Sequence, residues 1–219
     1  MGIILVAPCA AAEVPADEFE RALAATPNLD NGTKIYPLCA ACHLDTAWGK
    51  PDGSFPVIAG QHRKVLIKQL ADIRARRREN PTMFPFTDPE TLGDFQAIAD
   101  VSAYIATLDP DPNPGKGPGD HLEQGRALYA KHCADCHGVD ADGNADLYYP
   151  KLRGQHFAYM VRQLRWLRDG FRKNGNPVMV ERVKNFSDAD IDAVADYVSR
   201  IPGGGVKDDS TTKDTKDTK

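Results

Sequence analysis

The chain reads Cys39-Ala40-Ala41-Cys42-His43 in its first half and Cys133-Ala134-Asp135-Cys136-His137 in its second. Both stretches are C-x-x-C-H motifs, the signature of covalent haem c attachment. Two thiols three positions apart on a helical turn reach the two vinyl groups of one porphyrin, and the imidazole of the next residue lies under the iron. We therefore predict two covalently bound haem c groups, attached through Cys39, Cys42, Cys133 and Cys136, with His43 and His137 as iron ligands.

Two other kinds of cysteine site use similar spacings. A zinc site made of four cysteines does not need a histidine after each pair. A thioredoxin-like redox dithiol belongs in a βαβ pattern, which the sequence lacks. By composition, a single C-x-x-C-H motif arises by chance in roughly a few chains per thousand of this length, and two arise far more rarely. Haem attachment is therefore the favoured interpretation.

The two motifs belong to a tandem repeat. Cys39 and Cys133 are 94 positions apart, and a P-x-x-x-G-Q segment recurs at the same offset, at residues 56–61 and 150–155. The helix predicted after each segment carries an apolar stripe at i, i+4 and i+7. Met160 stands at the position of Leu66 in that stripe, so we interpret Met160 as a core residue and not as an iron ligand.

A second pair of methionines recurs after this helix, within Asn80-Pro81-Thr82-Met83 and Asn176-Pro177-Val178-Met179. The prolines predict a non-helical loop in each copy. A loop methionine usually fills a gap in packing. Its presence at equivalent sites of both haem domains instead predicts that Met83 and Met179 are the distal iron ligands.

Helix signals complete each copy. A Ser/Thr-x-x-acid capping pattern at 87–90 and at 187–190 predicts helices that run to about residues 108 and 201. A glycine and a tyrosine four residues apart precede each haem motif: Gly32 with Tyr36, and Gly125 with Tyr129. This spacing places the two residues on one helix face, where the glycine allows another helix to approach closely. No stretch alternates strongly enough to predict a sheet, so the fold class is all-α.

The length of 219 residues suits two domains of about 100 residues each. A stretch rich in proline and glycine separates the two copies and predicts a stiff linker. We predict a signal peptide at 1–12, an N-terminal extension at 13–27, a first domain at 28–109, the linker at 110–119, a second domain at 120–202 and a disordered tail at 203–219.

The first twelve residues indicate export to the periplasm. An apolar run at 3–7 and the small residues at 10–12 resemble a signal-peptide core and cleavage site. The usual basic n-region is missing, so either the start is truncated or the segment is not a signal peptide. Cys9 is an alternative lipidation site, but Pro8 is a poor residue to precede one. Peripheral membrane association therefore stays open.

The charge pattern points away from nucleic acid. The formal net charge is −4, and no basic stretch is interleaved with aromatic residues. Basic residues at 74–78 and 162–173 are expected on the outer faces of equivalent helices, either solvated or in ion pairs with haem propionates and across a domain interface. A docking face for an acidic redox partner is the alternative interpretation.

Together, the haem motifs, the P-x-x-x-G-Q segments, the methionines and the final helices resemble class I cytochromes c, specifically the two-domain dihaem carriers of the cytochrome c4 type. The resemblance covers about residues 28–202 and implies two small helical domains, each wrapped around one covalent haem. It implies that the carbonyl groups of Pro56 and Pro150 accept a hydrogen bond from the ligand histidines. The first copy departs from the family, because Leu44 follows His43 where glycine is usual and Trp48-Gly49-Lys50 reads as an insertion.

Histidine and methionine ligation leaves no open position on an iron, so the prediction is an electron carrier and not an enzyme. We expect redox proteins as donor and acceptor, such as a quinol-oxidising complex or dehydrogenase and a terminal oxidase, and no small-molecule substrate. Two alternatives stay open: a haem c enzyme, such as a dihaem peroxidase or a thiosulfate dehydrogenase, and a haem subunit of a larger dehydrogenase.

Overall fold

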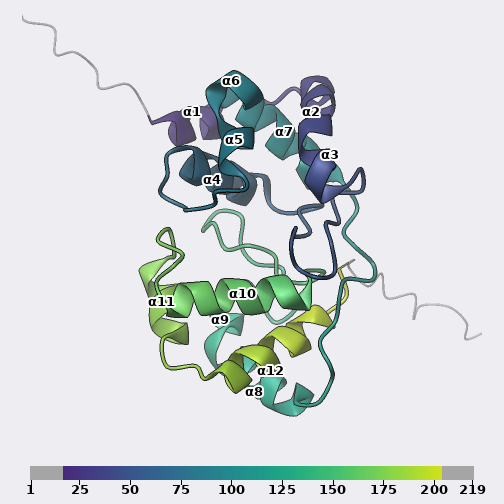
Figure 1. Ribbon diagram of the computed structural model, residues 1–219, viewed down its shortest axis with the longest axis vertical. Coiled ribbons are helices and arrows are strands. Elements are labelled where there is room, and N and C mark those ends of the chain that lie inside the picture. Colours follow the sequence, from purple (N-terminus) through teal and green to yellow (C-terminus); the bar gives the residue numbers. More distant parts are fainter. Residues whose placement is uncertain (1–16, 204–219) are drawn as a thin grey trace, which may run out of the picture.

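The computed structural model describes residues 17–203, which form two helical halves stacked along the long axis of the molecule (Figure 1). Within this range the one pairing of extended residues is an isolated bridge between Asn144 and Tyr149. The all-α prediction is confirmed. The predicted signal peptide, Cys9 and all but the first residue of the predicted tail lie outside the described residues.

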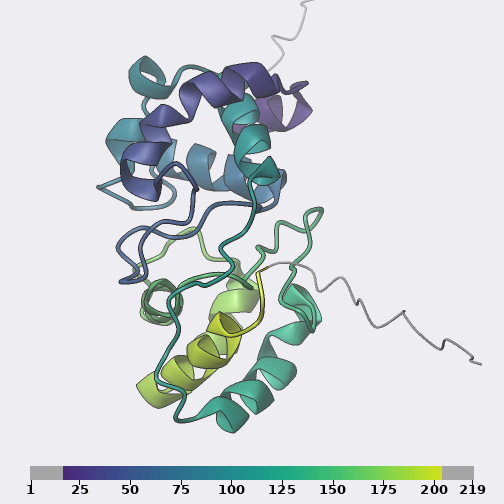
Figure 2. The same ribbon diagram turned by 90° about the vertical axis from the view of Figure 1, so that its right-hand side faces the viewer.

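Each half has a similar set of helices (Figure 2). The first half contains α1 (Glu18–Ala24), α2 (Leu29–Ile35), α3 (Pro37–His43), α4 (Arg63–Arg74), α5 (Phe84–Thr87), α6 (Pro89–Leu92) and α7 (Phe95–Thr107). The second half contains α8 (Leu122–His132), α9 (Ala134–His137), α10 (Phe157–Arg168), α11 (Pro177–Val183) and α12 (Asp188–Ser199). None of the helices between residues 17 and 203 has both the length and the hydropathy needed to cross a bilayer.

A close helix crossing organises each half, as the glycine and tyrosine spacing predicts. A Cβ atom built on Gly32 would lie 2.4 Å from the Asp100 carbonyl oxygen of α7, and one on Gly125 would lie 2.1 Å from the Ala193 carbonyl oxygen of α12. The side chains beside these crossings are buried, and they include Tyr36 and Tyr129. Each crossing therefore depends on the missing side chain of its glycine.

The capping patterns are confirmed in one half and corrected in the other. Ser187 and Asp190 form a reciprocal capping box at the start of α12. In the first half Asp88, not Thr87, caps the one-turn helix α6, which ends at Gly93 with φ 100°. The long helix α7 starts only after Asp94. The prediction of one helix from Thr87 is wrong because the left-handed backbone at Gly93 interrupts it.

The N-terminal extension packs on the first domain through α1. Ala22 of α1 is fully buried, and the guanidinium group of Arg63 donates hydrogen bonds to the carbonyl groups of Ala22 and Ala25 at 3.1 and 3.0 Å. Arg74 forms an ion pair with Glu18. The ring of Phe19 also lies 5.7 Å from that of Tyr148 in the second half. The extension thus contributes to the first domain's core and contacts the second.

The two halves meet through an interface in which equivalent residues exchange equivalent contacts. His62 Nε2 bonds to the Asp142 carbonyl oxygen at 2.8 Å, and its counterpart His156 bonds to the Trp48 carbonyl oxygen at 2.7 Å. Trp48 and Asp142 are themselves 94 positions apart. Trp48-Gly49-Lys50 is therefore a substitution at positions equivalent to 142–144, and its interpretation as an insertion is wrong.

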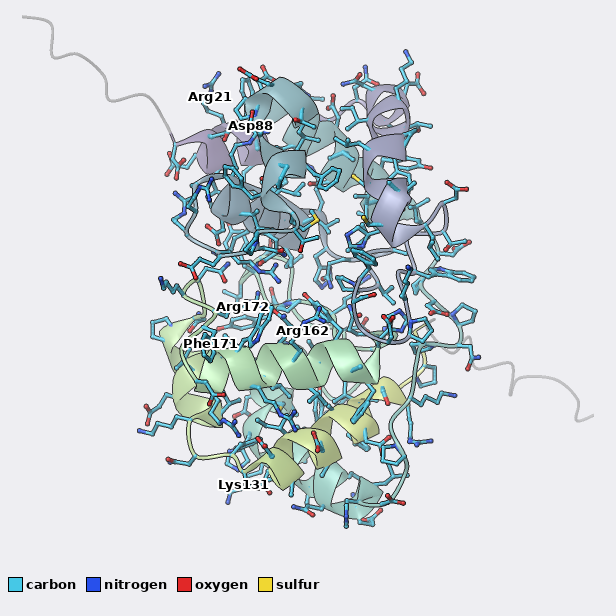
Figure 3. All side chains as sticks on the ribbon, viewed as in Figure 1. Arg21, Asp88, Lys131, Arg162, Phe171 and Arg172 are labelled. Carbon is cyan, nitrogen blue, oxygen red and sulfur yellow. The ribbon has the colours of Figure 1, made fainter. Side chains whose placement is uncertain are left out.

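Two arginines, Arg78 and Arg172, lie in this interface, and Figure 3 shows Arg172 between the two halves. Arg78 donates to Gln69 Oε1 at 2.8 Å and Gln163 Oε1 at 3.2 Å, while Arg172 donates to Gln163 Oε1 at 2.9 Å and Gln69 Oε1 at 3.1 Å. Burial of its guanidinium group, together with the nearby Arg78, lowers the pKa of Arg172 to about 10. The expectation that the basic residues lie on outer faces is wrong for this pair, because amide side chains from both halves enclose them.

Candidate haem sites

The two motif histidines are buried and held in the same way. His43 is 5% exposed and its Nδ1 lies 2.9 Å from the Pro56 carbonyl oxygen, while His137 is 6% exposed and lies 3.0 Å from that of Pro150. A carbonyl oxygen only accepts, so Nδ1 carries the proton and Nε2 keeps its lone pair for a metal. Burial lowers the pKa of both histidines, which favours the neutral form that a ligand requires.

The four motif cysteines are free and half-buried. Burial raises the pKa of Cys39 to about 11 and that of Cys133 to about 12. Redox dithiols and zinc sites use thiolates, whose formation these environments disfavour. Cys39 and Cys133 therefore do not favour a redox dithiol or a zinc site, and paired cysteines beside a buried histidine of fixed orientation fit haem c.

The residue after each histidine has a backbone conformation that favours glycine. Leu44 has φ 67° and ψ 164°, and Gly138 has φ 77° and ψ 161°. A side chain is strained in this region, at a cost of about 1–3 kcal/mol. Leu44 therefore replaces the glycine that the family usually has after the histidine, at a position whose backbone favours glycine.

We expect Leu44→Gly to stabilise the first domain by about 1 kcal/mol, because relief of strain outweighs the greater entropy of the unfolded chain. The free energy of unfolding in guanidinium chloride measures this change. Gly138→Leu is the matched reverse variant and is expected to destabilise the second domain. A Leu44→Gly variant less stable than the parent would contradict the strain argument.

A tyrosine locks each of these turns. Tyr36 Oη donates to the Leu44 carbonyl oxygen, and Tyr129 Oη donates to that of Gly138, both at 2.6 Å. Sequence analysis assigned these tyrosines only to the helix crossing. Their role in the turn after the histidine depends on tertiary structure, because each hydroxyl reaches a carbonyl group eight or nine positions along the chain.

The hydroxyl groups of Tyr36 and Tyr129 should ionise only at a higher pH than ordinary tyrosines do. Burial raises the pKa of both phenols well above the usual value of about 10. The folded state therefore keeps its full stability below pH about 10 and loses it as the pH rises through the higher folded pKa values. Spectrophotometric titration of phenolate should show two of the seven tyrosines ionising only with unfolding. Tyr36→Phe and Tyr129→Phe should each remove one of these late transitions and cost about 1 kcal/mol.

The two methionines lie at the starts of short helices. Met83 is the N-cap residue of α5, in a non-helical turn as predicted, whereas Met179 lies in the first turn of α11. Asn80 Oδ1 accepts from the Met83 amide at 3.2 Å just before α5, and Asn176 Oδ1 accepts from the Val178 amide at 2.9 Å within the first turn of α11. Met179 belongs to α11, so the predicted non-helical loop is wrong there, because proline fits the first turn of a helix. Both methionines are half-buried, whereas Met160 is buried in the core as predicted.

The comparisons with known proteins agree with this geometry. The chain is 31% identical to cytochrome c4 of Azotobacter vinelandii over 185 residues, which cover 75% of the chain and 84% of that protein. The chain belongs to the cytochrome c4 family. It is also 33% identical to cytochrome c4 of Stutzerimonas stutzeri over the same shares of the two chains. The crystal structure of reduced recombinant cytochrome c4 from Pseudomonas stutzeri matches with a TM-score of 0.70 and 28% identity, over 79% of this chain and 98% of that one.

A family model matches the second half of the chain. It describes subunit III of the cbb3-type cytochrome c oxidase and covers residues 120–198. Membership of the cytochrome c4 family makes the chain a dihaem electron-transfer cytochrome with two haem c groups. Its partners are accordingly redox proteins.

Proposed function

We propose that this cytochrome c4 carries electrons in the periplasm from a quinol-oxidising complex or dehydrogenase to a terminal acceptor such as an oxidase. The observation that carries the proposal is the repeated pair of a buried histidine and a proline carbonyl oxygen, at 2.9 and 3.0 Å. Both histidines present a free Nε2 in the same way, so both halves are built for the same chemistry. The match of residues 120–198 to an oxidase subunit supports an oxidase as acceptor.

The ligands that we propose are His43 with Met83 in the first domain and His137 with Met179 in the second. Haem c, when bound, supplies an iron that alternates between two oxidation states. Pro56 and Pro150 hold each imidazole in one tautomer and orientation. The thioethers of Met83 and Met179 would complete the ligands of the two irons, so these residues would support electron transfer without binding a substrate.

The interface arginines have a role in the same proposal. Arg78 is buried and Arg172 half-buried, and together they donate to neutral oxygens of Gln69, Gln163 and Tyr159. Two neighbouring guanidinium groups repel each other, so an anion between them would stabilise the pair. Burial opposes ionisation of Tyr159, yet these guanidinium groups lower the pKa of its phenol. We propose that Arg78 and Arg172 hold haem propionates between the domains. Residues 28–109, with α1 added, and 120–202 are the two domains of this proposal.

A second candidate function is a haem subunit bound permanently to a larger oxidoreductase. The match of residues 120–198 to an oxidase subunit favours it. This second function differs from the first in its protein partner and uses the same iron ligands. Size-exclusion chromatography of native extract separates the two, because a free carrier elutes near its mass of 23.9 kDa and a subunit elutes with the complex.

An optical redox titration of the matured protein tests the carrier proposal. We expect two electrons per chain, low-spin spectra in both oxidation states, and the weak far-red band from sulfur to iron at the intensity of two haems. A high-spin component, or rapid binding of peroxide or cyanide by the parent protein, would overturn the ligand assignment and favour the enzyme alternative.

A further inference from the structure

One peptide group joins each proximal histidine to the opposite domain. The carbonyl oxygen of Pro56 accepts from His43 at 2.9 Å, and the N–H group of the same peptide, on Val57, donates to Gln155 Oε1 at 3.0 Å. Gln155 belongs to the second half. The chain of bonds therefore starts at a histidine of one domain and ends at a glutamine of the other.

The second half repeats this arrangement in the reverse direction. The carbonyl oxygen of Pro150 accepts from His137 at 3.0 Å, and the N–H group of Lys151 donates to Gln61 Oε1, also at 3.0 Å. Gln61 and Gln155 are the equivalent last residues of the two P-x-x-x-G-Q segments. The two relays are thus crossed, each domain supplying the glutamine that ends the relay of the other.

The orientation of each glutamine amide is fixed by its other bonds. Gln155 Nε2 donates to the Val57 carbonyl oxygen at 2.8 Å, and its Oε1 also accepts from the His156 amide at 3.0 Å. Gln61 Nε2 donates to the Lys151 carbonyl oxygen at 3.0 Å. The amide oxygen has to face an N–H group and the amide nitrogen a carbonyl group, so each glutamine is held at two points.

We propose that Gln155 and Gln61 are crossed positioning residues, each setting the reduction potential of the opposite domain's haem through the proximal histidine. A hydrogen bond accepted from the Val57 N–H group polarises the peptide and makes the Pro56 oxygen a better acceptor. The His43 imidazole then donates more electron density to the iron, which favours the oxidised state. Loss of the glutamine should therefore raise the potential of the opposite domain. The argument rests on the proposed ligation by His43 and His137.

The two relays differ in their exposure to water. Gln155 and Val57 are buried at 9% and 8% exposure, whereas Gln61 and Lys151 are half-buried. Water can replace the Gln61 oxygen more readily than the Gln155 oxygen. Loss of Gln155 should therefore have the larger effect, and the first domain's potential depends more strongly on its neighbour.

Gln155→Leu and Gln61→Leu test the crossed relays, with the two potentials measured by redox titration followed on assigned haem methyl resonances. For Gln155→Leu we expect the ratio of reduced to oxidised haem in the first domain to rise about fivefold at fixed potential, the equivalent of one hydrogen bond. The second domain should stay near the parent value. Gln61→Leu should give the reverse pattern with a smaller change.

Phe19→Leu is the control, because it weakens the contact with Tyr148 across the interface and leaves both relays intact. In Phe19→Leu the difference between the two reduction potentials should equal that of the parent protein. The chemical shift of the Nδ1 proton of His43 should change in Gln155→Leu and not in Phe19→Leu.

A shift confined to the mutated glutamine's own domain, or an equal shift of both domains, would overturn the crossed relay while leaving the ligands in place. Failure of the ligation itself would show in the parent protein as a missing far-red band or a high-spin spectrum. The two failures are therefore distinguishable.

Discussion

Gly125→Ala should destabilise the second domain by roughly 3 kcal/mol or more, the upper end of the usual cost of overpacking. The new Cβ atom would lie 2.1 Å from the Ala193 carbonyl oxygen and 2.8 Å from the Tyr197 Cβ atom. The nearest obstacle is backbone of α12, so α8 has to move away along the whole crossing. Alanine otherwise favours a helix by about 1 kcal/mol over glycine, and this variant therefore tests packing against propensity.

Unfolding in guanidinium chloride, followed by circular dichroism and by the haem bands, measures this loss. Gly32→Ala is the matched variant in the first domain, where the nearest atom is the Asp100 carbonyl oxygen at 2.4 Å. Lys131→Ala, at an exposed position of the same helix α8, is the control and should be nearly neutral. A Gly125→Ala variant as stable as the control would show that α8 and α12 do not cross this closely.

Met83→His should lower one of the two reduction potentials by a few tenths of a volt, part of the roughly 0.8 V range that axial ligands span. Nitrogen ligands lower the potential relative to a thioether, and a histidine keeps the iron low-spin. The far-red band should fall to half its intensity. Met179→His should do the same to the other potential.

Met160→Leu is the control for both variants, because Met160 is 7% exposed in the core of the second half. It should leave both potentials and the far-red band unchanged. If Met83→His left the band at full intensity, Met83 would not be a ligand, and the proposed coordination of the first domain would fail.

Local chemistry made much of this molecule predictable from its sequence. The helix signals and the lack of strand-like alternation predicted the helical class, the paired glycines predicted the helix crossings, and the repeat offset predicted the core position of Met160. These predictions succeed because each depends on residues within one or two turns of helix, or on a comparison of the two copies.

Features that depend on how the halves meet could not be predicted in this way. Gln61 and Gln155 stood within the repeated segment, but their partners are 90 and 98 positions away in the chain. The sequence left open whether the basic run of Arg78 is solvated or paired across an interface, because the bond from Arg78 to Gln163 joins residues 85 positions apart. The non-helical prediction for Met179 failed for a local reason, since proline both ends helices and begins them.

The exchange of equivalent contacts between the halves makes the interface isologous, like that of a two-fold symmetric homodimer. Each half offers the other one glutamine, one histidine and one arginine from the same surface, to matching partners. A surface of this kind is complementary to itself and needs no covalent link to pair. Either half produced alone would expose it, and we expect such a half to associate with a second copy in the arrangement that the linker enforces here.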